Sequence, residues 1–277
     1  MRVDAHQHFW RYDPAEYGWI GEGMERLARD YLPADLAPLL AAEGIAGSVA
    51  VQARQTIEET RWLLDLAAKH PAILGVVGWV DLRSNEVGEQ LREFAANPRF
   101  VGVRHVVQDE PDVRFLLGEA FVGGLRQLHG FGLTYDLLLY PSQLPAAVEL
   151  AGMMPEQPFV LDHLAKPLIK PGILDPWQAD LRALARHPNV SCKLSGLVTE
   201  AAWQGWKRAD FAPYLEVALE AFGPKRLMMG SDWPVCLLAA EYPDVVAIVT
   251  DFIARLSDSE QALILGGTAS RFYGLTR

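Results

Sequence analysis

The sequence predicts an α/β fold, a (β/α)8 barrel of the TIM type built as a single domain over residues 1–277. Three observations predict it. Short runs rich in Val, Ile and Leu recur along the chain, and an amphipathic stretch follows each, the pattern of buried parallel strands joined by helices. Eight such alternations in about 250 residues match a barrel better than an open sheet. No low-complexity linker divides the chain, so one domain is the simpler interpretation.

The apolar runs place the strands, and the amphipathic stretches place the helices. Strands are expected at residues 3–9, 45–52, 73–80, 100–107, 133–139, 159–163, 190–195 and 226–232. Helices are expected between them at residues 33–43, 57–70, 86–96, 113–129, 142–153, 176–187 and 211–222. Two further helices, at 244–256 and 258–273, are expected to close the ring and pack outside it. Pro and Gly fall between elements, as at Gly223-Pro224, and mark loops before strands.

Two predicted connections are longer than the ~2 to 6 residues usual for a strand-to-helix loop. Residues 10–32 carry five Trp and Tyr side chains, and residues 196–210 carry Trp203 and Trp206. Both follow the carboxyl ends of strands, the face on which barrel active sites are built. They are candidate lids, and the alternative is that their aromatic side chains only complete the core.

Composition excludes several classes of protein. The formal net charge of −10, without a compensating run of Lys or Arg, would repel a phosphate backbone, so we expect no nucleic-acid partner. The apolar runs are short of the ~20 residues that span a bilayer, and the N-terminus has no signal-peptide core, so we expect no membrane association and a cytoplasmic protein. Cys192 and Cys236 lack metal or redox spacing and are expected to be buried.

The first strand ends with two histidines, His6 and His8, spaced by two residues. This spacing puts both imidazoles on the same side of a strand, where two neutral nitrogens can bind one divalent metal ion. A His-x-His pair alone is weak evidence for a metal site. Its position at the end of a buried strand strengthens that interpretation.

Other predicted strands also end in polar side chains, which an apolar barrel interior does not need. These are Gln52 with Arg54 in the loop beyond it, Arg104-His105, Asp162-His163, Lys193 with Ser195, and Asp232 followed by Trp233. Side chains alternate along a strand, so only one of each adjacent pair should face the barrel axis. We expect Arg104 and His163 to face it, and His105 stays an open alternative to Arg104. Asp4 and Asp136, early in their strands, are expected to form salt bridges at the barrel floor.

Asp232 is the most suggestive carboxylate, because it ends a strand whose interior is apolar. A carboxylate there must be exposed, paired or metal-bound, since burying it alone is costly. The alternative is structural, because an Asp ahead of Trp-Pro could cap a helix. The chain has no Gly-x-Ser-x-Gly elbow and no Gly-rich nucleotide loop, which argues against serine-hydrolase chemistry and nucleotide cofactors.

These residues resemble the amidohydrolase superfamily, in its branch of sugar and aromatic lactonases. The matching segments are residues 3–10, 29–33, 51–54, 77–79, 104–105, 161–163, 192–201 and 230–240. The last two segments are long and specific, whereas the first alone would identify only the superfamily. The resemblance implies a distorted (β/α)8 barrel that hydrolyses a sugar lactone to its aldonic acid, with L-fucono-1,5-lactone or its L-galactono or D-arabinono relative as the expected substrate.

The resemblance also implies the site. His6, His8 and Asp232 would bind one divalent metal ion, expected to be zinc, although some relatives in this branch work without metal. The fifth and seventh strands supply no His, which argues against a second metal ion. Asp232 would be the general base, and His163 would help to polarise the carbonyl group. The side chains expected to bind substrate are Gln52, Arg54, Arg104, His105, Lys193 and Trp233.

Two other interpretations stay open at this point. One is a metal-dependent hydrolase or decarboxylase of an aromatic or dicarboxylic acid on the same scaffold. Such anionic substrates require more than one inward Arg, and the sequence places only Arg104 well, with Arg54 in reserve. The other is a catalytically silent binding protein, which would have no need for His6, His8, His163 and Asp232 at one rim. The sequence leaves open whether the chain forms a homo-oligomer.

Overall fold

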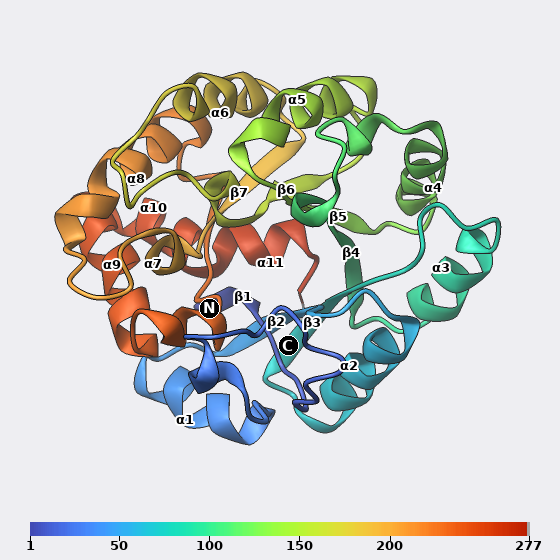
Figure 1. The fold of residues 1–277 in the computed structure, drawn as a ribbon, viewed down its shortest axis with the longest axis horizontal. Helices are drawn as coiled ribbons and strands as arrows, with labels where there is room; N and C mark the ends of the chain where they lie inside the picture. The colour runs from blue at the N-terminus through green and yellow to red at the C-terminus, as the bar shows by residue number, and fades with distance from the viewer. Residues whose placement is uncertain (276–277) are drawn as a thin grey trace.

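Eight parallel strands form the centre of the protein in a computed structural model that describes residues 1–275 (Figure 1). Each strand pairs with the next one in the chain, so spatial order follows sequence order from β1 to β8. The strands are β1 (Val3–Gln7), β2 (Gly47–Val51), β3 (Ile73–Gly78), β4 (Phe100–Val106), β5 (Thr134–Leu138), β6 (Phe159–Leu161), β7 (Val190–Leu194) and β8 (Leu227–Met229). The predicted fold class is confirmed.

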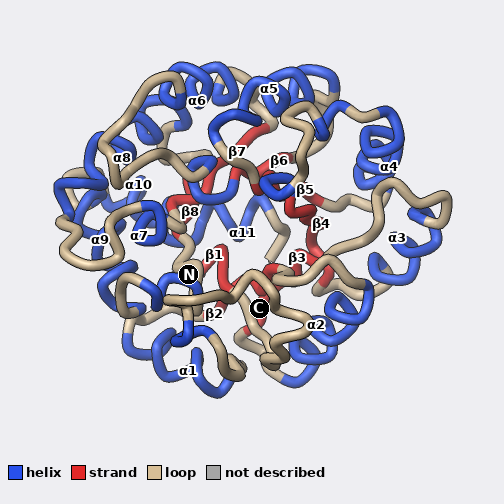
Figure 2. Tube along the Cα trace, in the orientation of Figure 1, coloured by secondary structure: helices blue, strands red, loops and turns tan. Residues whose placement is uncertain are grey.

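Helices surround the strands in an outer ring (Figure 2). The ring consists of α1 (Pro33–Ala42), α2 (Ile57–Lys69), α3 (Val87–Ala95), α4 (Glu119–Gly130), α5 (Leu144–Met153), α6 (Trp177–Ala185), α8 (Arg208–Phe222) and α9 (Tyr242–Ile253). The short α7 (Leu197–Glu200) follows β7 directly. The large apolar core lies between the strands and this ring, and a smaller apolar cluster fills the barrel around Val3, Val160 and Met228.

The barrel closes irregularly between β1 and β8. The two strands are joined beyond their ends, where the amide of His8 donates to the carbonyl oxygen of Trp233 over 2.7 Å. The amide of Asp232 donates to the carbonyl oxygen of His6 over 2.8 Å. The buried Asp4 carboxylate also accepts hydrogen bonds from the Ser231 amide and hydroxyl and from the Tyr242 hydroxyl. The predicted salt bridge of Asp4 is therefore wrong, because hydroxyl and amide donors satisfy this carboxylate.

The C-terminal segment differs from the prediction in two ways. The expected helix over 258–273 is broken into α10 (Asp258–Ala262), a π-helical turn (Leu263–Gly267) and α11 (Thr268–Phe272). The segment also does not pack outside the ring, since α11 lies across the centre of the barrel in Figure 1. At Gly266 an added Cβ would lie 2.2 Å from the carbonyl oxygen of Met1. Tyr273 reaches into the barrel and donates its hydroxyl to Asp136 over 2.8 Å. The segment therefore covers the amino-terminal end of the barrel, where it keeps the apolar interior from water.

Every strand ends one to three residues earlier than predicted, and at β6 and β8 this difference shapes the site. β6 ends at Leu161 and β8 ends at Met229, so Asp162, His163 and Asp232 lie on the loops that follow. The expected helix over 113–129 likewise begins late, because a 3₁₀ turn (Phe115–Leu117) precedes α4.

Cys192 and Cys236 are both buried and unpaired, as predicted. Within residues 1–275, no helix combines the length and apolar character needed to cross a membrane.

Candidate active site

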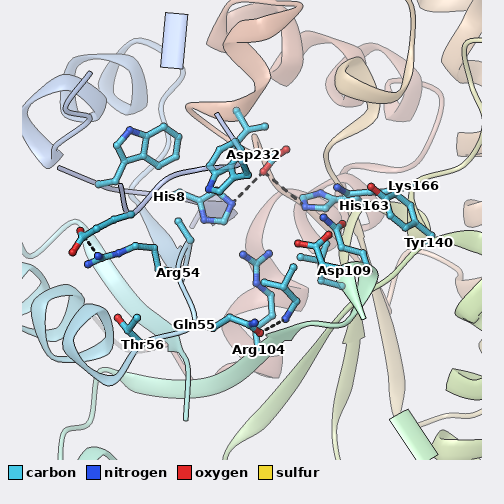
Figure 3. Close-up of a pocket in the computed structure, with 18 residues that line it drawn as sticks. His8, Arg54, Gln55, Thr56, Arg104, Asp109, Tyr140, His163, Lys166 and Asp232 are labelled. Atoms are coloured by element: carbon cyan, nitrogen blue, oxygen red, sulfur yellow. Dashed lines mark hydrogen bonds and ion pairs between the residues drawn. The ribbon is translucent and has the colours of Figure 1, made fainter. Parts of the chain in front are cut away.

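A cavity of about 650 Å³ opens at the carboxyl ends of the strands (Figure 3). Its wall includes charged and imidazole side chains from several strand ends together with aromatic and aliphatic groups. The lining residues are His8, Trp10, Glu16, Trp19, Ala53, Arg54, Gln55, Thr56, Arg104, Val106, Gln108, Asp109, Leu138, Tyr140, His163, Lys166, Asp232 and Val235. This is the face on which (β/α)8 enzymes carry their active sites.

His6, His8 and Asp232 converge at the bottom of the cavity. His6 Nε2 lies 3.2 Å from His8 Nε2, and Asp232 Oδ1 lies 3.3 Å from His8 Nε2 and 3.7 Å from His6 Nε2. His8 Nδ1 lies 2.8 Å from the carbonyl oxygen of Val51, so this nitrogen carries a proton and Nε2 faces the cluster. The Asp232 side chain turns to these imidazoles rather than to a helix terminus, which rules out the helix cap considered from the sequence.

The three donor atoms fit one divalent ion. Ligands at the ~2.0–2.1 Å typical of zinc in a tetrahedral site lie ~3.3 Å apart. The separations of 3.2, 3.3 and 3.7 Å are close to that value, so His6, His8 and Asp232 can share one ion with little movement. His6, Asp162 and His163 form a second group of potential ligands. The Asp162 carboxylate is already within 3.1 Å of Arg104 and 2.9 Å of Lys193, which makes it the less available ligand.

Asp232 is held in a conformation that costs backbone energy. Its φ angle of 58° is in the left-handed region, which non-glycine residues adopt at a cost of ~1–2 kcal/mol. The amide of Asp232 is fixed by the carbonyl oxygen of His6, which binds the β8 loop to β1. Burial opposes the charge on Asp232, but His163, His8 and His6 outweigh it and hold the pKa of this carboxyl well below its usual range. Asp232 is therefore ionised at neutral pH.

His163 begins an unusual left-handed turn. Residues 163–166 all have φ between 50° and 57°, which brings His163 and Lys166 to the same cavity wall. Trp177 Nε1 donates to the Leu164 carbonyl oxygen over 2.6 Å, which supports the strained turn. His163 Nδ1 lies 2.9 Å from Ser195 Oγ, and Nε2 lies 3.8 Å from Asp232 Oδ1. Burial lowers the pKa of His163 to about 4, so its imidazole is neutral at neutral pH.

A charged network lies beneath these residues. Lys193 Nζ contacts Asp136 Oδ2 at 2.5 Å, Asp162 Oδ1 at 2.9 Å and His6 Nδ1 at 3.0 Å. Burial raises the pKa of Asp136 to about 6 against the attraction of Lys193. Burial also opposes the charge on Asp162, but Lys193, His6 and Arg104 hold its pKa well below the usual range. Asp136 does form the salt bridge expected from the sequence, and its partner is Lys193.

Five predicted site residues line the cavity, namely His8, Arg54, Arg104, His163 and Asp232. His6 is fully buried directly behind them. Four expected substrate-binding residues are placed differently. Gln52 and Lys193 are 0% exposed and lie under the cavity floor, Gln52 against Arg104 and Lys193 against His6. Trp233 packs on Phe9 and Tyr31.

His105 faces away from the cavity wall, which corrects the expectation that it binds substrate. Its ring stacks on Phe115 with centroids 5.0 Å apart, and its Nε2 lies 2.7 Å from Glu110 Oε1. The neighbouring Arg104 faces the cavity, because adjacent side chains on β4 point to opposite sides. The same rule does not separate Asp162 from His163. β6 ends before both residues, and the left-handed turn directs both side chains inward.

Sequence reasoning missed several cavity residues. Lys166, Tyr140 and Gln108 line the wall, and Lys166 Nζ lies 5.5 Å from the centre of the Tyr140 ring. Lys166 follows His163 by three residues. This spacing places both side chains on the same cavity wall only because residues 163–166 form a left-handed turn, which the sequence did not predict. Asp162 was not expected to face the barrel axis, yet it contacts Arg104, His6 and Lys193.

The first aromatic loop covers one side of the cavity, whereas the second does not contribute to it. Trp10, Glu16 and Trp19 from the first loop line the wall, and Glu16 forms an ion pair with Arg54 across it. Among the described residues of segment 196–210, none lines this cavity. The Trp206 indole in that segment donates to the Ala239 carbonyl oxygen over 2.8 Å. The second loop therefore does not form part of this cavity wall.

Glu59 on α2 fixes the loop that carries Arg54. One carboxylate oxygen accepts the amides of Ala53 and Arg54 at 2.9 and 2.7 Å, and the other lies 3.7 Å from Arg54 Nε and 3.4 Å from the Tyr17 hydroxyl. Burial raises the pKa of Glu59 to about 7, against these hydrogen bonds and the charge of Arg54. Arg54 thus has a carboxyl group on each side, Glu16 at the rim and Glu59 in the interior.

Comparison with known proteins agrees with this geometry. The chain is 46% identical to an L-fucono-1,5-lactonase from Burkholderia multivorans, covering 99% of this chain and 96% of the relative. It is 37% identical to an L-fucono-1,5-lactonase from Burkholderia ambifaria, covering 100% and 97% of the two chains. A crystal structure of an amidohydrolase from Burkholderia multivorans with bound zinc is 46% identical, matches with a TM-score of 0.95 and covers 100% of both chains.

The family assignment covers nearly the whole chain. The sequence model of the amidohydrolase family matches residues 3–275, which include every strand of the barrel and every residue of the cavity wall. The chain belongs to the amidohydrolase family.

Proposed function

We propose that this protein is a lactonase that hydrolyses L-fucono-1,5-lactone, or a close stereochemical relative such as L-galactono- or D-arabinono-lactone, to the aldonic acid. The observation that carries the proposal is the position of Asp232 between His8 and His163 at the bottom of the cavity (Figure 3). The two full-length relatives named L-fucono-1,5-lactonase support the substrate.

The charges of the cavity favour a neutral substrate over an aromatic or dicarboxylic acid. Arg104 forms an ion pair with Asp162, and Arg54 forms one with Glu16 and lies close to Glu59. Both inward guanidinium groups thus have carboxylate partners already. An anionic substrate would have to compete with these partners, whereas a lactone needs only hydrogen bonds.

Asp232 is the proposed general base. It is ionised and buried, and it accepts a proton from the attacking water as the new C–O bond forms at the lactone carbonyl. Collapse of the tetrahedral intermediate breaks the ring C–O bond, and Asp232 returns the proton to the ring alkoxide. The protons balance, because the one removed from water is the one that the leaving oxygen gains.

His163 is the proposed hydrogen-bond donor to the carbonyl oxygen. With Ser195 donating to Nδ1, a neutral imidazole carries its proton on Nε2, which faces Asp232 and the cavity. That proton can stabilise the negative charge that develops on oxygen in the transition state. His6, His8 and Asp232 would hold one zinc ion, which supplies Lewis-acid polarisation when bound.

Residues on the cavity wall are proposed to bind the sugar. Arg54, Arg104 and Lys166 can donate hydrogen bonds to its hydroxyl groups, and Gln108 can donate or accept them. Trp10 and Trp19 supply an apolar wall for a ring face.

A proton-release assay tests the function. The purified protein is mixed with a library of aldonolactones in weak buffer containing a pH indicator, with and without a chelator. We expect the fastest acid release with L-fucono-1,5-lactone or one of its two named relatives. No release above the spontaneous rate with any aldonolactone would overturn the proposal.

A further inference from the structure

His6 has two possible partners at the nitrogen that faces away from the cavity. Lys193 Nζ lies 3.0 Å from His6 Nδ1 in hydrogen-bond geometry, and Asp162 Oδ1 lies 3.4 Å from the same atom. All three side chains are 0% exposed, so no bulk water competes for these contacts. Because Lys can only donate and a carboxylate can only accept, the two partners demand opposite tautomers of His6.

The contact with Lys193 excludes a proton on Nδ1. An ammonium group donates to Nδ1, which leaves the proton of a neutral imidazole on Nε2. That proton points towards His8 Nε2 at 3.2 Å. His8 can accept it, since the His8 proton is on Nδ1 and bonds the carbonyl oxygen of Val51 at 2.8 Å. A continuous hydrogen-bonded chain therefore runs from Lys193 through both histidines without any metal ion.

A metal ion requires the other tautomer. Binding through Nε2 needs the lone pair of that nitrogen, so the proton must be on Nδ1, where it needs an acceptor. Asp162 Oδ1 can supply it, because this oxygen has no hydrogen-bond partner among residues 1–275 and lies 3.4 Å from His6 Nδ1. The ion contact of 2.9 Å between Lys193 Nζ and this oxygen lacks hydrogen-bond geometry.

We propose that Lys193 and Asp162 are positioning residues with opposite effects on His6: Lys193 holds the tautomer that cannot bind metal, and Asp162 accepts the Nδ1 proton of the tautomer that can. The exchange moves one proton from Nε2 to Nδ1 of His6 and changes the charge of no residue. This inference rests on the metal site of the proposed lactonase. It means that the chain itself weakens its metal site and keeps both ring nitrogens of His6 hydrogen-bonded, to Lys193 and to His8, when no metal is bound.

The first test measures the tautomer directly in metal-free protein. Long-range ¹H–¹⁵N correlation spectra separate the two neutral tautomers of histidine, and comparison with His6→Gln assigns the His6 signal. We expect the proton of His6 on Nε2. A proton on Nδ1 in the metal-free wild type would overturn the proposal, and this test requires no variant of the network to fold.

The second test measures zinc affinity by competition with a chelator. Lys193→Met combined with Asp136→Asn removes one positive and one negative charge, so the net charge beneath the site is unchanged. We expect this double variant to bind zinc at least about tenfold more tightly. The reason is that the buried hydrogen bond from the Lys193 ammonium to His6 Nδ1 no longer opposes the tautomer of His6 that binds metal. We expect Asp162→Asn to bind zinc ~10–100-fold more weakly, since one amide cannot accept from both His6 and Arg104.

Tyr273→Phe is the matched control for the zinc measurements. It removes the hydrogen bond to Asp136 at the far end of the same buried network without changing charge. We expect its zinc affinity to stay within about threefold of wild type. Equal affinity of wild type and the double variant, or unchanged affinity in Asp162→Asn, would contradict the proposal. The lactone assay is independent of these measurements. If the protein shows the expected His6 tautomer and zinc affinities but hydrolyses no lactone, the proposed function is refuted and the inference about His6 stands.

Discussion

Asp232 Oδ1 lies 3.3 Å from His8 Nε2, although the two residues come from opposite ends of the barrel chain. The contact depends on the closure between β1 and β8, where the Asp232 amide bonds the His6 carbonyl oxygen. The carboxylate is fixed by the same backbone that closes the barrel. The same hydrogen bonds therefore close the barrel and position the site. Substitutions of single residues can separate the chemical role of a side chain from its role in the fold.

Asp232→Asn should abolish turnover without unfolding the protein. Asn keeps the size of the side chain and tolerates the left-handed φ of 58°, so the thermal melting temperature should not change. Loss of the general base should lower kcat by about 10² to 10⁴. The exposed Asp65→Asn on α2 is the control for the substitution itself. A variant with more than half the wild-type kcat would leave His163 as the remaining candidate base.

Gly196→Ala should damage the site through His163. Gly196 has a φ of 63°, and an added Cβ would lie 2.5 Å from His163 Nδ1, so the imidazole must move. Gly205 has a φ of 81° with open space around it, and Gly205→Ala is the matched control for backbone strain. We expect both variants to lose about 1 kcal/mol or more of stability, and only Gly196→Ala to lose at least about tenfold in kcat. Equal kcat values for the two variants would show that the position of His163 does not matter.

Glu59 should make stability depend on pH. Its pKa is raised from 4.5 to about 7 in the folded state, so between these values the folded protein keeps a proton that the unfolded chain releases. The contribution of Glu59 to the free energy of unfolding is full below pH 4.5 and is lost as pH rises through about 7.

Urea unfolding of wild type and Glu59→Gln at pH 5 and pH 8 measures this effect. The stability of wild type relative to the variant should fall by about 2.5 kcal/mol between the two pH values. Glu58→Gln, an exposed carboxyl group on the same helix, controls for the loss of a side-chain charge. A relative stability that rises with pH would show that Glu59 is ionised more easily when folded.

Elemental analysis should find at most one zinc ion per chain after reconstitution and removal of excess metal. His6, His8 and Asp232 offer one set of three donor atoms, enough for a single ion. His8→Gln removes one donor and should reduce the bound zinc strongly, whereas His129→Gln on α4 should not. Two ions per wild-type chain, bridged in one site, would show that the ligand set is larger than described.

The sequence by itself determined the order of the strands and helices, because buried parallel strands and amphipathic helices have different periods of apolar residues. It also placed His8, His163 and Asp232 close to the carboxyl ends of strands, and so predicted that they share one rim. Parallel strands of a barrel present their carboxyl ends on the same face, so position along the strand was sufficient for this prediction.

Only the tertiary structure decided which of these side chains reach the cavity and which lie beneath it. Lys193 was expected to bind substrate, yet it lies under the floor against His6, because depth within a barrel depends on strand stagger that local sequence does not encode. Asp162 turns inward together with His163 because a left-handed turn replaces the end of β6. That turn is strained, and two features from distant segments of the chain stabilise it. The Trp177 indole donates a hydrogen bond to the turn, and Gly196 has no side chain that would collide with His163.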